Sequence, residues 1–325
     1  MEVERHVKDI HYPAPSSRPD SAFMWRIVEK TGTEDVAFVY RAVSTVNGRD
    51  QVEFAESVAV PSSRDEKWVL VISSFLGCPV GCTFCDAGLY PGRPLTCEEI
   101  LSQADLMVTG RYPDGRVPAE KFKVQFARVG EPMLNPHALD ALEALTNRWR
   151  APGLLPCVST MAPSGSERLF DRLMDIRKRV YGDVDFQLQF SVHSTDEVER
   201  QKLFGIRSWT LEEISAWGSR FHIPGKRKVT LNFALHSGAV LDPRTLASVF
   251  PTDHFIVKLT PLNPTITGRM HNLASAIDSE SPRSADDLVD SIKDLGFECI
   301  LSIGNPEENA LGSNCGQVIA SARRA

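Results

Sequence analysis

The chain has 325 residues, of which 42% are hydrophobic, and a formal net charge of −6. A chain of this length can bury a large core, either in two domains or in one α/β barrel. Its opening, MEVERHVKDI, has no apolar secretory segment, and apolar runs such as residues 68–72 are too short to span a bilayer. We therefore expect a cytoplasmic protein without a membrane partner. The negative charge does not favour binding nucleic acid mainly through its phosphates.

The first part of the chain predicts an arm and a hairpin. Residues 1–34 are polar and rich in proline and serine, which indicates an extended arm. Residues 36–43 and 52–61 flank an Asn-Gly turn and predict a β-hairpin, which a linker at 61–67 follows.

From Trp68 onward, six apolar strand-like runs alternate with six amphipathic stretches of helical periodicity. The predicted strands are 68–74, 121–127, 154–160, 184–192, 228–235 and 254–260, and the predicted helices are 96–109, 136–149, 165–179, 210–221, 242–250 and 284–296. Six β-then-α units imply a parallel sheet with right-handed crossovers, which either opens as a doubly wound fold or curls into a barrel. The motif positions favour an α/β fold of the partial (β/α)6 TIM-barrel type. We expect an N-terminal arm and hairpin extension at 1–66, a barrel at 67–304, and a C-terminal tail at 305–325.

The segment GCPVGCTFCDAG (77–88) places Cys78, Cys82 and Cys85 directly after the first strand of the series. In a reduced compartment, clustered cysteines indicate metal binding or catalysis rather than disulfides. A structural zinc site takes four ligands, usually in two pairs, and no second pair is present. Three thiolates would leave one iron of a 4Fe–4S cluster open to a chelating cosubstrate. A zinc knuckle is the alternative.

The C-x3-C-x2-C loop, with Phe84 before its last cysteine, resembles the cofactor loop of the radical S-adenosylmethionine (SAM) enzymes. The resemblance implies that the open iron binds the amino and carboxylate groups of SAM, and that an electron from the cluster cleaves SAM to a 5'-deoxyadenosyl radical. VGEP (129–132) resembles the family's GGEP element, so Gly130 and Glu131 would hold the SAM amino group. Ser159, at the end of the third predicted strand, would bond the SAM carboxylate or ribose.

A closer resemblance is to the radical SAM methylases that act on carbon 2 or carbon 8 of an adenine in 23S ribosomal RNA. GEPMLN, VST, QFSVHSTDEVERQKL, TPLNP and NCGQV occur in the order found in that family, from about residue 36 to the end. The resemblance implies that Cys315, of CGQ, accepts a methyl group from one SAM. A radical from a second SAM then removes hydrogen from that methyl, and the carbon adds to the substrate.

The same resemblance implies further roles. Asn263 and Ser191 would help to hold SAM, and Glu56 would serve as general base. His193 is compatible with strand-end packing or with function.

The chain also departs from this family. Val71 stands where the family has the cysteine that releases the covalent substrate adduct, and Arg128 replaces a glycine. SIGNPEEN (302–309) replaces a basic run, and only about 35 arm-like residues precede the hairpin, where the family has a helical RNA-positioning domain. Release must then use another residue, or the chemistry differs; Cys97, Cys157 and Cys299 are the candidate thiols, and each is also typical of a buried small hydrophobic residue.

These departures predict a divergent paralogue: a radical SAM methyltransferase that modifies an unreactive sp2 carbon of a non-ribosomal or small-molecule substrate. Its cofactors would be a 4Fe–4S cluster and SAM, reduced by a partner such as flavodoxin or ferredoxin. Three alternatives stay open: the ribosomal RNA adenine methylase itself, a radical SAM enzyme that removes hydrogen directly from its substrate, and a non-catalytic iron–sulfur or zinc protein.

Overall fold

The computed structural model describes residues 23–318 except 59–61, 91, 183 and 280. Most of the predicted arm (1–22), the first residue of the linker and the end of the tail (319–325) therefore lie outside the described residues. No helix in the described part of the chain is both long and apolar enough to cross a membrane.

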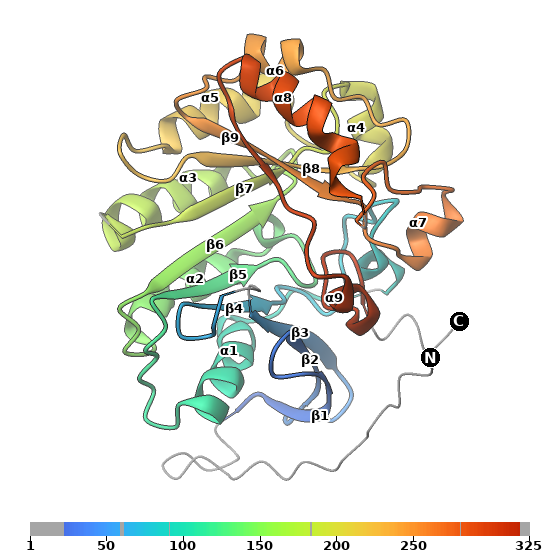
Figure 1. Cartoon of the computed structure of the whole chain (residues 1–325). Coiled ribbons are helices and arrows are strands. Elements are labelled where there is room, and N and C mark those ends of the chain that lie inside the picture. Colours follow the sequence, from blue (N-terminus) through green and yellow to red (C-terminus); the bar gives the residue numbers. More distant parts are fainter. Residues whose placement is uncertain (1–22, 59–61, 91, 183, 280, 319–325) are drawn as a thin grey trace.

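Ten strands form one sheet whose spatial order follows the chain from β1 to β10 (Figure 1). The strands are β1 (Trp25–Gly32), β2 (Ala37–Ser44), β3 (Gln51–Val58), β4 (Lys67–Ile72), β5 (Lys121–Phe126), β6 (Leu154–Thr160), β7 (Gln187–Ser191), β8 (Val229–Leu235), β9 (Phe255–Pro261) and β10 (Glu298–Leu301). Strands β1–β4 pair antiparallel and β4–β10 pair parallel. Among the strands that the structure describes, β10 does not pair with β1, so the barrel stays open. The predicted α/β fold of the partial-barrel type is confirmed.

Most helices follow the parallel strands and lie along the outside of the curved sheet, whereas the last helix, at 306–311, lies beside β2 (Figure 1). They are α1 (Cys97–Arg111), α2 (Pro136–Ala144), α3 (Glu167–Ile176), α4 (Glu197–Leu203), α5 (Leu211–Phe221), α6 (Pro243–Val249), α7 (Ile266–Met270), α8 (Asp286–Asp294) and α9 (Pro306–Leu311). Capping boxes start α1 and α5, where Thr96 pairs with Glu99 and Thr210 pairs with Glu213. In each box two orphan donors of the first turn are satisfied reciprocally, which explains why these helices begin at T-x-x-E.

The predicted arm is partly wrong, because residues 25–32 form the edge strand β1. The indole of Trp25 is buried and donates a 2.7 Å hydrogen bond to the carbonyl of Glu99. A register shift between Ile27 and Glu29 interrupts the period-two pattern, so the strand is hard to see in the sequence. The short elements α4, α7, α9 and β10 were also not predicted, and β10 adds a seventh parallel strand.

Alternation along the parallel strands creates two different faces. On β5, Phe122, Val124 and Phe126 are buried in the core between sheet and helices, whereas Gln125 lines a pocket inside the barrel. β3 pairs with β4 across the predicted boundary at 66–67, so the hairpin continues the barrel sheet. The carboxyl ends of the parallel strands meet at one end of the barrel, where functional loops collect.

Candidate active site

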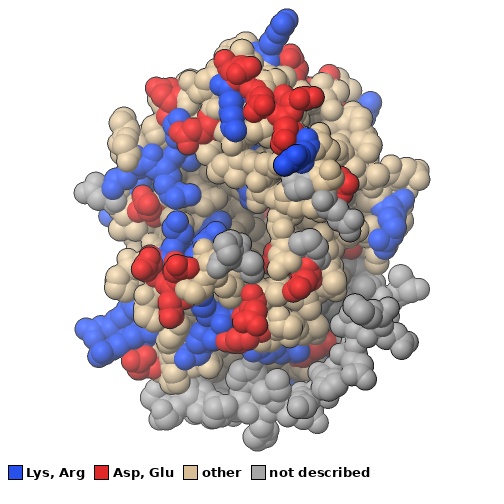
Figure 2. Space-filling view, viewed as in Figure 1, with Lys and Arg blue, Asp and Glu red and all other residues tan. Residues whose placement is uncertain are grey.

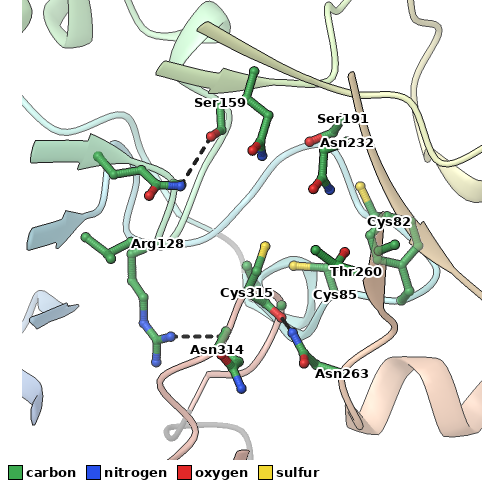
Figure 3. A pocket seen from close by; sticks show the side chains of 18 of the residues that line it. Cys82, Cys85, Arg128, Ser159, Ser191, Asn232, Thr260, Asn263, Asn314 and Cys315 are labelled. Atoms are coloured by element: carbon green, nitrogen blue, oxygen red, sulfur yellow. Dashed lines mark hydrogen bonds between the residues drawn. The ribbon is translucent and has the colours of Figure 1, made fainter. Parts of the chain in front are cut away.

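A cavity of about 370 Å³ lies inside the barrel near the carboxyl ends of its strands (Figure 3). It brings together residues that lie up to 259 positions apart in the sequence, from Ser57 to Gly316. The sequence-predicted residues that line it are Cys78, Cys82, Phe84, Cys85, Gly130, Glu131, Ser159, Ser191, Asn263 and Cys315. Glu56 is the one predicted site residue that does not.

The cysteine loop presents its thiols to this pocket in an environment suited to bound thiolates. Burial raises the pKa of Cys78 to about 11. It also raises the pKa of Cys82 well above its ordinary value, and the nearby Cys85 and Cys78 sulfurs add to this rise. Backbone N–H groups of Val80 and Gly81 oppose this shift at Cys78 by bonding its sulfur. Such thiols stay protonated unless a cation compensates them, and amide donors then stabilise the metal-bound thiolate.

Within the described ranges, no three His, Cys, Asp or Glu side chains converge on the position of a single metal ion. A cluster of several irons spaces its ligand sulfurs further apart than one ion does. The mutual electrostatic influence of the three thiols shows that they share one site. The residues therefore fit an iron–sulfur cluster as the group that they would hold.

Hydrogen bonds from residues 265–267 fix the backbone at the end of the cysteine loop. Asp86, which is buried, accepts hydrogen bonds from the backbone N–H of Thr267 (2.9 Å) and of Ile266 (3.2 Å) at the start of α7. Thr265 donates its hydroxyl to the carbonyl of Phe84 at 3.1 Å. The loop is thereby tied to the segment that follows β9.

Glu131 is a buried carboxylate at the end of the segment that follows β5. Its Oε1 accepts the N–H of Met133 at 2.9 Å, and its Oε2 accepts the N–H of Met161 at 2.8 Å. Burial nevertheless raises its pKa to about 7. The Thr160 side chain also bonds this carboxylate, and of its four lone pairs one stays available to accept a hydrogen bond from an amino group in the pocket. Gly130 has a φ of +106°, and a Cβ there would lie 2.6 Å from Cδ2 of Phe75, so glycine is required.

The CGQ turn packs against the cysteine loop. The carbonyl of Gly316 accepts the N–H of Asp86 at 2.9 Å, and the carbonyl of Cys315 accepts Nδ2 of Asn263 at 3.0 Å. Gly316 has a φ of +84°, and a Cβ would lie 3.3 Å from the carbonyl oxygen of Phe84. The glycine of CGQ thus permits both the turn and the close approach of the two loops.

Cys315 is exposed to the pocket, and its thiol lies close to Cys85 (Figure 3). A charge on Cys315 is the strongest influence on the pKa of Cys85 after burial. Desolvation raises the pKa of the Cys315 thiol, while Lys258 and Arg128 lower it. The pocket can therefore host a thiol that reacts beside the proposed cluster.

Comparisons with known proteins agree with this arrangement. No protein-family model matches the chain. Over 215 residues it is 31% identical to a protein named probable dual-specificity RNA methyltransferase RlmN from Thermus thermophilus, covering 64% of this chain and 57% of that protein. The resemblance to the radical SAM methyltransferases is confirmed.

Two further comparisons support it. Dual-specificity RNA methyltransferase RlmN from Marinobacter nauticus is 27% identical over 223 residues, covering 66% of this chain and 58% of that protein. The chain thus spans 57–58% of the length of these two relatives. A radical SAM methyltransferase from Sphaerobacter thermophilus shares the fold, with a TM-score of 0.69, 19% identity, and coverage of 91% of this chain and 81% of that chain.

Two residues of the pocket combine packing with exposure to the cavity. The His193 ring contacts the Phe84 ring edge-on, with centroids 4.8 Å apart. Burial lowers the pKa of His193 to about 3, so the ring is neutral, and its Nδ1 accepts the N–H of Ala234 at 3.0 Å. The ring proton is therefore on Nε2. On the neighbouring strands, Ser159 accepts a long hydrogen bond from Gln125, at 3.4 Å.

Glu56, expected to be the general base, points to the opposite face of the hairpin. It is 2% exposed, and its carboxylate accepts hydrogen bonds from the Tyr40 hydroxyl (2.6 Å) and the Trp68 indole (2.5 Å). Its neighbour Ser57 lines the pocket instead. The assignment of Glu56 as a base acting in this pocket is therefore corrected.

Arg128, noted in the sequence only as a departure, holds the CGQ loop. Its guanidinium donates to the carbonyls of Gly312 (2.7 Å), Ser313 (3.0 Å) and Asn314 (3.3 Å), and pairs with the Glu53 carboxylate (Figure 3). No local sequence signal could have found partners so distant in the chain.

The structure also places the thiols that were considered for product release. Val71 lines the pocket, so a cysteine at this position would lie in the same pocket as Cys315. Cys157 is buried on β6, with its sulfur 3.6 Å from the carbonyl of Leu155, two residues before Ser159 on the same face. Cys97 begins α1 and Cys299 lies on β10, and neither lines the pocket.

Proposed function

We propose that this protein is a radical SAM methyltransferase in which Cys315 carries a methyl group to an unreactive sp2 carbon. One observation carries the proposal: Cys315 shares a pocket with Cys78, Cys82 and Cys85, and its turn is bonded to their loop. When bound, a 4Fe–4S cluster and SAM supply the methyl group and a 5'-deoxyadenosyl radical. A reducing partner such as flavodoxin or ferredoxin would deliver the electron.

The residues of the pocket suit the carrier role. The Cys315 thiol must lose its proton before its sulfur can accept a methyl group, because the thiolate is the nucleophile. Lys258 and Arg128 favour the thiolate, and Asn263 fixes the backbone of the turn. Glu131, with Ser159 and Ser191 on neighbouring strands, would hold SAM.

We propose an RNA nucleotide as the substrate. The relatives of this chain are named RNA methyltransferases, and this outweighs the acidic character that suggested a smaller substrate. The smaller substrate remains the second candidate, because SIGNPEEN (302–309) replaces the basic run of the RNA methylases.

The test is anaerobic incubation of the reconstituted protein with SAM, without and then with reductant. SAM alone should leave one extra methyl group on Cys315, found by peptide mass spectrometry. Adenine-containing RNA stem-loops and a metabolite extract are then offered with reductant, and RNA should gain the methyl group.

Three variants sharpen this test. Cys315→Ala should keep the brown cluster and lose product, whereas Cys157→Ala, which also removes a thiol inside the barrel, should keep both. Cys82→Ala should lose the cluster, because two thiolates do not retain it. Full activity of Cys315→Ala would show that hydrogen is removed directly from the substrate. Stoichiometric zinc in place of iron would show a non-catalytic metal protein.

A further inference from the structure

Three lysines project into the barrel interior, one at the lining of the reaction pocket and two nearer the amino ends of the strands. Lys258 lines the pocket itself. Lys67 precedes the pocket-lining Val69 by two residues on β4, and Lys123 precedes Gln125 by two on β5. Since side chains alternate along a strand, all three lie on the interior face. The residues between them, such as Trp68 and Phe122, pack into the core on the other face.

The three ammonium groups lie close enough to repel one another. Burial, together with the charges of Lys123 and Lys67, lowers the pKa of Lys258 to about 8. The pKa of Lys67 is lowered by burial and then by Lys123 and Lys121. The register of the parallel strands agrees with this proximity. Lys67 is level with Lys121, and Lys123 is level with Val69, two residues along β4 from Lys67.

No acidic partner offsets this repulsion in the described part of the chain. None of the ion pairs there involves Lys67, Lys123 or Lys258. Lys228, on the outside, shows the contrast because it pairs with Glu298 at 2.6 Å. Gathering cations in a partly desolvated interior is unfavourable unless an anion completes the site.

A second, independent observation comes from Asn232, which is level with Lys258 on the adjacent strand. Its side chain lines the pocket (Figure 3), is 8% exposed, and its Oδ1 has no hydrogen-bond partner among the described residues. Because Oδ1 is an acceptor, it indicates a missing hydrogen-bond donor, such as a hydroxyl or amino group of a nucleotide whose phosphate lies at the lysines. The open side of the barrel provides access: Figure 2 shows a central hollow with Lys and Arg side chains gathered beside it.

We propose that Lys67, Lys123 and Lys258 form an anion subsite that holds a phosphate group of the substrate while its base reaches Cys315. This inference rests on the proposed methyl transfer to a nucleotide. Lysine ammonium groups suit phosphate oxygens because they are point charges without directional demands. Lys258 joins the subsite to the reaction centre, because its charge also acts on the Cys315 thiol.

The test measures binding alone, with the cluster-reconstituted protein and neither SAM nor reductant. AMP, adenosine, pyrophosphate and a short adenine-containing RNA are titrated by calorimetry at several salt concentrations. AMP should bind about tenfold more tightly than adenosine, and Lys123→Met should remove about one ion from the salt dependence of AMP or RNA binding. Lys67→Met should act in the same direction.

Two controls separate a subsite from a structural role. Lys202→Met removes an exposed lysine of α4 and should leave the salt slope unchanged, and Lys123→Arg should keep the slope of the wild type. RNA binding that depends on Lys123 identifies a phosphodiester as the source of the phosphate, and AMP binding that depends on it identifies a free nucleotide. Equal affinity for AMP and adenosine, or an unchanged slope in Lys123→Met, would overturn the subsite. Because no turnover is needed, this result is independent of whether Cys315 is ever methylated.

Discussion

Replacing Arg128 with methionine should release the CGQ loop while the barrel stays folded. Arg128 has a side chain that is 2% exposed, and it donates to three consecutive carbonyls of residues 312–314. Hydrogen bonds from a charged donor contribute about 1.5–3 kcal/mol each and do not add fully. A loss of about 2–3 kcal/mol in loop stability corresponds to an increase of about 30–150-fold in the population of the open loop.

The assay is native-state hydrogen exchange on peptides that cover residues 308–318. Gly312, Ser313 and Gln317 donate backbone hydrogen bonds within this segment, so their amides report its opening. Exchange there should accelerate about 30-fold or more in Arg128→Met. The free energy of unfolding should also fall, by about 3–5 kcal/mol, because Glu53 loses its buried charge partner.

Arg148→Met is the matched control. Arg148 also pairs with a buried acid, Asp105, at 2.5 Å, but it does not touch the CGQ loop. Its substitution should lower global stability without a selective change in residues 308–318. If the two variants accelerated exchange in this segment equally, or if Arg128→Met left it unchanged, the anchoring role of Arg128 would be refuted.

Two further predictions concern the pocket. Because the pKa of Glu131 is raised to about 7, protonation removes its charge below that pH, and SAM affinity measured by equilibrium dialysis should fall as the pH is lowered from about 7.5 to 5.5. Glu131→Gln should bind SAM weakly at every pH, and a pH-independent wild type would contradict the contact between the charged carboxylate and SAM. Val71→Cys places a thiol in the same pocket as Cys315, so it should convert a covalent substrate adduct, detected by mass spectrometry, into released product. Persistence of the adduct in this variant would show that release needs a different position.

The sequence was sufficient for the parallel strands because their periodicity is regular. Phe122, Val124 and Phe126 alternate with Lys123 and Gln125, so β5 was predicted to within one residue. β1 was missed because a register shift breaks its pattern, and β10 because four residues carry too little signal. Regular local patterns could be predicted, and interrupted or very short ones could not.

The site shows the same division. The cysteine loop and Glu131 could be located because each motif follows a strand of a parallel barrel. Glu56 was misplaced because motif order fixes the strand but not the face: a shift of one residue puts Ser57 in the pocket and Glu56 behind it. Arg128 could not be understood from the sequence, because its partners lie 75 and 184 or more positions away.

The hydrogen bond between Asp86 and Gly316 couples the binding of a cofactor at the cysteine loop to the docking of the turn that carries Cys315. Residues 84–86 are shared: one side carries the thiol of Cys85, and the other receives the turn that carries Cys315. The coupling is reciprocal. If the docked turn stabilises the bound cofactor by some free energy, the bound cofactor stabilises the docked turn by the same amount. If the proposed cluster is bound at this loop, a protein stripped of it by oxidation would therefore also hold the turn of Cys315 less firmly.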